Sequence, residues 1–211
     1  MSRTLEQLIN ELRKYGITEK TLEVFKVIKR EWFVEDKEQA YLNEALPFFG
    51  QTTSQPLVIA NIIDELELSK QDIVLEVGTG SGFQTCLIAY LAFKVYSFEI
   101  DHLIYKKAIE NISYCQSIIP NLNIEVIRKD IFNSYQEIQE IIRQEGRIDK
   151  AVFSFSINKI PTFISESINL IIAPIDINQK YQKLQKIIRQ GDKTIVKDLG
   201  YVSFVKARRE K

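Results

Sequence analysis

The chain has 211 residues, of which 45% are hydrophobic and 27% are charged, and its 28 basic and 28 acidic side chains give a formal net charge of zero. This length and composition predict one well-buried globular core and argue against a disordered or fibrous class. The balanced charge does not indicate strong attraction to nucleic acid, and no apolar run is long enough to span a bilayer. We therefore expect a cytoplasmic protein that has neither nucleic acid nor a membrane as a partner. The sequence leaves its oligomeric state open.

The first 55 residues predict two amphipathic helices and a loop. Apolar residues recur at helical spacing from residue 3 to 15, and Gly16 stands where a helix C-cap is expected. Thr18 is a suitable N-cap for a second helix, which we expect to continue through residues 22 to 33. The segment 35 to 55 has no clean period and predicts an ordered loop.

Strands and helices alternate from residue 56 onward, and Pro56 suits the first turn of a helix. The expected helices are 56 to 68, 83 to 92, 101 to 116, 134 to 146 and 160 to 168, and the expected strands are 73 to 77, 94 to 100, 123 to 130 and 148 to 156. This strict alternation predicts an α/β fold with a doubly wound, mostly parallel sheet.

The C-terminal segment allows two interpretations. It is either a helix through Tyr181, Leu184 and Ile188, or a pair of strands that meet at the turn "RQGD". The β-branched run "TIV" and the alternation in "YVSFVKA" favour an antiparallel hairpin at the end of the sheet. We expect residues 1–55 to pack as N-terminal helices and an active-site loop on a cofactor-binding region of residues 56–211, within one structural domain.

The cysteine and histidine content does not indicate a metal site. Cys86 and Cys115 lack a CxxC spacing, and His102 is the single histidine. We expect two small buried thiols, and a histidine at a solvated helix start, with no metal ligands.

The run "DIVLEVGTGSG" combines an apolar strand with a glycine-rich turn. It carries Glu76, Gly78, Gly80 and Gly82 to the carboxyl end of a parallel strand, where such folds bind ligands. A dinucleotide fingerprint would place its third glycine at position 83, which is Phe83 here. The spacing therefore argues against a pyrophosphate ligand.

Two acidic side chains stand at the next strand ends. Glu99 ends the strand "YSFE", where a carboxylate can accept hydrogen bonds from both ribose hydroxyls. Asp130 ends the following strand and can accept from the exocyclic amine of adenine. Three adjacent strand ends thus suit an adenosine without phosphate, as in S-adenosyl-L-methionine, whose product is S-adenosyl-L-homocysteine.

These motifs resemble those of the protein-L-isoaspartate O-methyltransferase family. The run "VLEVGTGSGFQT" is similar to the family's cofactor loop, "VYSFE" to its ribose-binding strand, and "YVSFV" to its final strand. The most specific likeness is upstream, in "KREWFV" and "AYLNEALPFFGQTTSQP". The resemblance covers most of residues 20 to 205.

The resemblance implies roles for individual residues. Ser54 would stand next to the transferring methyl group and orient the acceptor carboxylate, and the residues implied at the substrate are Gln51, Thr52, Thr53 and Val202. The residues expected at the cofactor are Glu76, Gly78, Thr79, Gly80, Gly82, Glu99, Asp130 and Ile131. The alternative is structural, because Ser54 could simply cap the helix that starts at Pro56.

Three functions follow from this resemblance. The first is an S-adenosyl-L-methionine-dependent carboxyl O-methyltransferase that repairs isoaspartyl residues of peptides or proteins. The second keeps the cofactor but methylates an aspartyl carboxylate of a dedicated peptide or protein, and the third is a cofactor-binding protein without turnover. The stretch "FSFSINKIP" departs from the family, and we expect its Phe153 and Phe155 to reshape the acceptor pocket.

Overall fold

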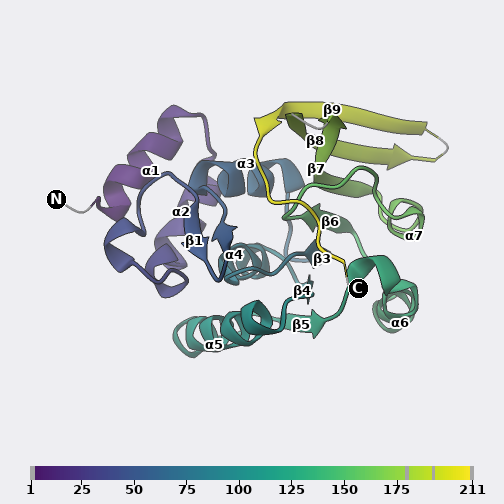
Figure 1. The fold of residues 1–211 in the computed structure, drawn as a ribbon, viewed down its shortest axis with the longest axis horizontal. Coiled ribbons are helices and arrows are strands. Elements are labelled where there is room, and N and C mark those ends of the chain that lie inside the picture. Colours follow the sequence, from purple (N-terminus) through teal and green to yellow (C-terminus); the bar gives the residue numbers. More distant parts are fainter. Residues whose placement is uncertain (1–2, 179–180, 192, 210–211) are drawn as a thin grey trace.

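The computed structural model describes residues 3–178, 181–191 and 193–209. A seven-stranded sheet with the order β5-β4-β3-β6-β7-β8-β9 forms its centre (Figure 1). Its strands are β3 (Ile73–Val77), β4 (Lys94–Glu99), β5 (Ile124–Arg128), β6 (Lys150–Phe153), β7 (Leu170–Asn178), β8 (Tyr181–Gln190) and β9 (Lys193–Val202). The first five strands run parallel to one another, whereas β8 pairs antiparallel with β7 and β9 pairs antiparallel with β8, so the predicted α/β fold is confirmed.

Helices cover both faces of the sheet. One face carries α3 (Pro56–Leu66), α4 (Phe83–Leu91) and α5 (His102–Ile118), with α1 (Leu5–Lys14) and α2 (Glu19–Val27) packed outside them. The other face carries α6 (Tyr135–Glu145) and the short α7 (Thr162–Ser165). We call the apolar residues between the sheet and α3, α4 and α5 the first apolar cluster, and those between the sheet and α6 and α7 the second apolar cluster. Because side chains alternate along a strand, Val74 belongs to the first cluster, whereas Leu75 and Val77 belong to the second.

The N-terminal region corrects two details of the sequence interpretation. The second helix ends at Val27, not at residue 33, and a 3-10 turn, η1 (Arg30–Trp32), follows it. Ile28 has extended dihedral angles (φ −93°, ψ 100°), which turns the chain so that Arg30 lies inside the protein.

The loop of residues 35 to 55 contains secondary structure of its own. It holds a 3-10 turn, η2 (Lys37–Gln39), and an antiparallel hairpin of β1 (Leu46–Phe48) and β2 (Gln51–Thr53). Both residues of the connecting turn have a positive φ, 47° at Phe49 and 72° at Gly50, as tight two-residue hairpin turns require. We call residues 46–54 the acceptor loop, after the role that the resemblance implies for Ser54.

The C-terminal segment forms strands. The predicted antiparallel hairpin of β8 and β9 is confirmed, and the helical alternative is wrong. Residue Asp192 of the predicted turn "RQGD" lies outside the described residues. As part of β8, Leu184 packs into the first apolar cluster. A short helix without such packing would be only marginally stable in water.

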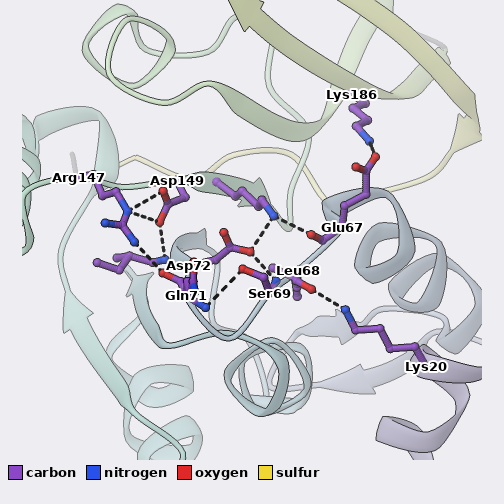
Figure 2. A network of polar contacts seen from close by, with 11 residues as sticks. Lys20, Glu67, Leu68, Ser69, Gln71, Asp72, Arg147, Asp149 and Lys186 are labelled. Carbon is purple, nitrogen blue, oxygen red and sulfur yellow. Dashed lines mark hydrogen bonds and ion pairs between the residues drawn. The ribbon is translucent and has the colours of Figure 1, made fainter.

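Ion pairs and hydrogen bonds gather where the chain enters β3 (Figure 2). The Asp72 carboxylate accepts from the Ser69 backbone at 2.6 Å and from Lys150 Nζ at 2.7 Å, and the buried Lys186 pairs with Glu67. This network fixes the amino ends of the central strands. The opposite, carboxyl edge of the sheet is left for ligand binding.

The structure also bears on the expectations for the cysteines, the histidine and membrane-spanning helices. Cys86 and Cys115 are free and buried, as the sequence predicts. His102 is exposed at the first position of α5, which also agrees with the prediction. None of the helices in residues 3–178, 181–191 and 193–209 combines the length and the apolar character that crossing a membrane requires.

Candidate functional site

The glycine turn leaves β3 with its backbone open toward one cavity. The N–H groups of Gly78 and Thr79 both donate to the Phe98 carbonyl of β4, at 2.8 and 3.2 Å. Gly80 has a φ of 55°, and a Cβ built there would meet nothing within 4 Å. The turn is therefore held by its first residues, and the open space beside Gly80 allows close approach of a ligand.

Glu99 is bonded to this turn from the end of β4. Its Oε2 accepts from the Gly80 N–H at 3.1 Å, and its Oε1 accepts from the Asp101 N–H at 3.0 Å. Burial raises the pKa of Glu99, and these backbone bonds partly oppose the shift. A carboxylate has about four acceptor positions, so acceptor capacity remains for a ligand hydroxyl.

Asp130 lies at the end of β5 and begins the 3-10 turn η3 (Ile131–Asn133). Its Oδ1 accepts from the Phe132 N–H at 2.9 Å, and the residue is 2% exposed. The capping bond fixes the carboxylate at the edge of the sheet, beside Ile131.

The acceptor loop is supported from beneath by a buried arginine. Arg30 Nη2 donates to the Thr53 hydroxyl at 3.0 Å and to the Ser54 carbonyl at 3.1 Å. The same guanidinium bonds three further carbonyl oxygens, those of Ala40, Leu42 and Glu44. Burial lowers the pKa of Arg30 to about 10, so the side chain stays protonated at neutral pH.

Sequence reasoning missed Arg30. It assigned the residue to the continuous helix of residues 22 to 33. The one local hint is the aromatic pair Trp32 and Phe33, which begins two residues after Arg30.

Ser54 does not cap α3. The N-cap of that helix is Gln55, whose side chain makes no capping hydrogen bond, and the Leu57 N–H of the first turn donates to Asn43 Oδ1 at 3.0 Å. The structural alternative for Ser54 is therefore wrong. The residue instead lines the same cavity as the glycine turn.

One cavity joins the carboxyl ends of β3, β4, β5 and β6 to the acceptor loop. It lies where the strand order reverses between β3 and β6, which is the usual ligand position in open α/β sheets. The space enclosed by its lining residues, open mouth included, is about 970 Å³. The predicted site residues that line it are Gln51, Thr52, Thr53, Ser54, Gly78, Thr79, Gly80, Glu99, Asp130 and Ile131.

Three predicted site residues lie away from the cavity surface. Glu76 is fully buried behind the glycine turn. Gly82 is the N-cap of α4 with a φ of 84°, and a Cβ there would lie 2.7 Å from Ile112 Cγ1. Val202 ends β9 and packs against the first apolar cluster. Their ligand-binding roles stay predictions.

The Glu76 carboxylate connects to the cavity through hydrogen bonds. It accepts from the Thr85 hydroxyl at 2.5 Å, from the Ser97 hydroxyl at 2.7 Å and from Gln84 Nε2 at 3.0 Å. Gln84 itself lines the cavity. Burial raises the pKa of Glu76 to about 7, against the opposing effect of these three donors.

The two phenylalanines expected to reshape the pocket have different environments. Phe155 lines the cavity, and its ring atom Cδ1 would lie 3.1 Å from a Cβ built on Gly78. Phe153 is fully buried in the second apolar cluster and does not reach the cavity, so the expectation is wrong for this residue. The inward direction of Phe153 follows from the alternation of side chains along β6.

The C-terminal residues also contribute to the wall, which the sequence interpretation did not anticipate. Val205, Lys206 and Arg208 line the cavity beyond the end of β9. The sequence carries no local pattern that places this tail over the glycine turn, because its position depends on contacts with distant residues.

Comparison with known proteins identifies related sequences. The family model described as Protein-L-isoaspartate(D-aspartate) O-methyltransferase (PCMT) matches residues 3–211. A relative from Photorhabdus laumondii named protein-L-isoaspartate O-methyltransferase is 41% identical over 103 residues, which is 47% of this chain and 50% of the relative. A Klebsiella pneumoniae relative of the same name is 43% identical over the same shares. The chain thus spans about half the length of the curated relatives it matches.

Solved structures share the whole fold. A Plasmodium falciparum protein described as a protein-L-isoaspartate O-methyltransferase, in complex with S-adenosyl-L-homocysteine, has a TM-score of 0.84 at 20% identity. The match covers 99% of this chain and 100% of that one. A second structure named protein-L-isoaspartate O-methyltransferase has a TM-score of 0.83 at 20% identity and covers 98% of this chain and 66% of its own.

Proposed function

Because the chain belongs to the protein-L-isoaspartate(D-aspartate) O-methyltransferase family, we propose that it methylates the free carboxylate of isoaspartyl residues in peptides or proteins. The methyl donor in this proposal is S-adenosyl-L-methionine. The observation that carries the proposal is the shared cavity, where Ser54 of the acceptor loop and Gly80 of the glycine turn line one space.

The acid groups at the strand ends fit this cofactor. Glu99 and Asp130 would repel a phosphate, whereas they accept hydrogen bonds from hydroxyl and amino groups. Glu99 is already fixed to the Gly80 backbone and would hold the ribose, and Asp130 would hold the adenine amine. When bound, the cofactor supplies an electrophilic methyl group on a sulfonium. Residues 56–211 form the cofactor side of the site in this proposal, and residues 1–55 the acceptor side.

The residues of the chain have a limited chemical task. A peptide α-carboxylate has a pKa of about 3.5, so at neutral pH it reacts without a general base. In the transfer, the carboxylate oxygen would take the methyl group from the sulfonium, whose sulfur would keep the electron pair of the broken bond. The Ser54 hydroxyl would donate to the carboxylate and hold one oxygen in line with the methyl group.

The wall of the cavity would limit water at the reacting atoms. Phe48 and Phe155 line it with apolar surface, and Ile131 adds to this wall at the end of β5. Orientation in a water-poor space is the main source of rate for such a transfer.

The product ester explains how methylation leads to repair. The backbone nitrogen that follows the modified residue attacks the ester carbonyl and releases methanol, which closes a succinimide. Hydrolysis of the succinimide then yields aspartyl and isoaspartyl chains. Repeated methylation of the isoaspartyl form would enrich the normal aspartyl form.

The names of the curated relatives favour an isoaspartyl acceptor over an aspartyl carboxylate of a dedicated partner. A repair assay tests the proposal. An isoaspartyl peptide is incubated with the protein and S-adenosyl-L-methionine, and the peptide forms are separated by chromatography over time. We expect the aspartyl form to accumulate only when the cofactor is present. An unchanged isoaspartyl peptide, in a preparation that binds the cofactor by calorimetry, would rule the proposal out.

A further inference from the structure

The residues after β9 cross the carboxyl edge of the sheet, as the yellow segment in Figure 1 shows. We call residues 203–209 the C-terminal strap. The Gln182 side chain bonds both backbone groups of Phe204, accepting from its N–H at 2.6 Å and donating to its carbonyl at 3.1 Å. Ser156 bonds the next part, donating from its N–H to the Val205 carbonyl at 2.8 Å and accepting from the Ala207 N–H at 3.0 Å.

The strap directs its basic side chains toward the cavity. Ala207 packs against the second apolar cluster, whereas its neighbours Lys206 and Arg208 line the cavity. This alternation is that of an extended chain. The Arg209 guanidinium lies over the Phe132 ring at 4.0 Å, which holds the end of the described strap.

Arg208 joins the two sides of the cavity mouth. Its Nη1 donates to Asp101 Oδ2 at 3.0 Å. On the opposite side, the Gln51 amide is oriented with its oxygen toward the guanidinium. In this orientation the oxygen accepts from Arg208 Nε at 2.9 Å and also from Nη2. A planar guanidinium can make these bonds together because its donors point in fixed, divergent directions.

Each partner of Arg208 leads to a different half of the site. Asp101 donates its backbone N–H to Glu99, the carboxylate bonded to the glycine turn. Gln51 begins β2, which continues into Ser54. Arg208 therefore lies in a continuous series of hydrogen bonds from the glycine turn to the acceptor loop.

The acceptor loop needs such support because its hairpin is small. The strands β1 and β2 have three residues each and, among the residues that the structure describes, pair with one another alone. An isolated two-stranded hairpin is only marginally stable in water. Arg30 supports the Thr53 and Ser54 end of this loop from beneath, and Arg208 bonds its other end at Gln51.

We propose that Arg208 is a positioning residue that holds the acceptor loop against the cofactor side of the cavity. The inference rests on the proposed function, since it explains how the acceptor carboxylate meets Ser54 in a fixed place. A ligand that orders Glu99 and Asp101 also orders Arg208 and Gln51 through these bonds. Binding at the cofactor side and binding of the acceptor peptide are then positively coupled, and the coupling is reciprocal.

The test compares Arg208→Ala and Arg208→Lys with Arg143→Ala as the matched control. Arg143 is an exposed arginine of α6 that pairs with Glu140, distant in sequence from every residue of the strap. We expect Arg208→Ala to raise the KM of an isoaspartyl peptide about fivefold, a size typical of a part-exposed, hydrogen-bonded ion pair. We expect the Kd of S-adenosyl-L-homocysteine to change by less than about twofold, since Glu99 and Gly80 keep their own bond.

The lysine variant separates positioning from charge. Lysine keeps a positive charge for Asp101 but cannot bond Gln51 with a planar fork, so its KM should lie between those of the wild type and the alanine variant. If the lysine variant had the same peptide KM as the wild type, the charge of Arg208 alone would be sufficient, and the positioning role would be overturned.

Amide hydrogen exchange decides the inference without turnover. Arg208→Ala should speed exchange in residues 46–54 relative to the wild type, and Arg143→Ala should not. Unchanged exchange in that segment, together with an unchanged peptide KM, would overturn the inference. If the wild type transferred no methyl group to the peptide, the proposed function would fail, and the exchange comparison would still test the contact.

Discussion

The buried Arg30 guanidinium and the Thr53 hydroxyl lie 3.0 Å apart, so a cation from the segment after α2 holds the loop that carries Ser54. Arg30 is 1% exposed and makes its hydrogen bonds to neutral oxygen atoms of this loop and the preceding segment. The position of Ser54 therefore depends on a side chain that does not touch the cavity.

Replacing Arg30 should destabilise the whole protein. Arg30→Ala leaves four backbone carbonyls and one hydroxyl without their donor, and we expect the free energy of unfolding to fall by about 3 to 5 kcal/mol. Thr53→Val removes one acceptor, which serves Arg30 and the Leu46 N–H, and should cost about 2 kcal/mol. Urea unfolding measures both. An equal decrease in the free energy of unfolding in the two variants would contradict the central role of Arg30.

Replacing Ser54 should separate binding from turnover. Ser54→Ala removes the hydroxyl proposed to orient the acceptor carboxylate, and we expect kcat/KM for an isoaspartyl peptide to fall roughly tenfold or more. Calorimetry should find the affinity for S-adenosyl-L-homocysteine almost unchanged. Ser117→Ala is a suitable control, because that hydroxyl bonds the Tyr114 carbonyl on the exposed side of α5. An unchanged rate for Ser54→Ala would remove this residue from the mechanism.

The buried Glu76 should make stability depend on pH. Its pKa rises from 4.5 in the unfolded chain to about 7 in the folded protein, so between these values the folded state binds more protons. Stability from this group is complete below pH 4.5 and decreases as the pH rises through 7, by about 3 kcal/mol in total.

Glu76→Gln tests this pH dependence. We expect urea unfolding between pH 5 and 8, a range set around the folded pKa of about 7, to give a flatter profile for the variant than for the wild type. Burial raises the pKa of Glu99 as well, which contributes a pH dependence of stability of the same sign in both proteins. Identical profiles would show that Glu76 does not titrate in this range.

Phe153 and Phe155 should respond differently to truncation, although they stand two residues apart. Phe153→Ala empties a fully buried site and should cost about 3 to 5 kcal/mol of unfolding free energy. Phe155→Ala removes part of the cavity wall and should cost about 2 kcal/mol while lowering kcat/KM, because water gains access beside Gly78. A larger stability loss for Phe155→Ala than for Phe153→Ala would contradict these placements.

Local patterns in the sequence were sufficient for most of the sheet and for the glycine turn, although no strand was expected over Leu170–Asn178, which forms β7. The alternation of elements, the glycine turn and the position of Glu99 depend on spacing within short segments, and each is found where expected. Pro56 begins α3, as its missing N–H allows. The sheet edge then collects these residues, since parallel strands bring their carboxyl ends together.

The acceptor side depends on tertiary contacts and was predicted less well. The strands β1 and β2 are three residues long, too short for a period to be recognised. Arg30 leaves its helical pattern because buried carbonyls bind its guanidinium. Arg208 reaches the cavity through contacts with Asp101 and Gln51, which lie more than a hundred residues earlier in the chain.

The most direct test of the proposed activity is methyl transfer from radiolabelled S-adenosyl-L-methionine to a matched pair of peptides. One peptide contains an isoaspartyl residue and the other a normal aspartyl residue, and the product is measured as base-labile methanol. We predict label on the isoaspartyl peptide alone, and its loss in the Ser54→Ala protein. Label on the aspartyl peptide alone, or on neither peptide in a preparation that binds the cofactor, would contradict the proposed function.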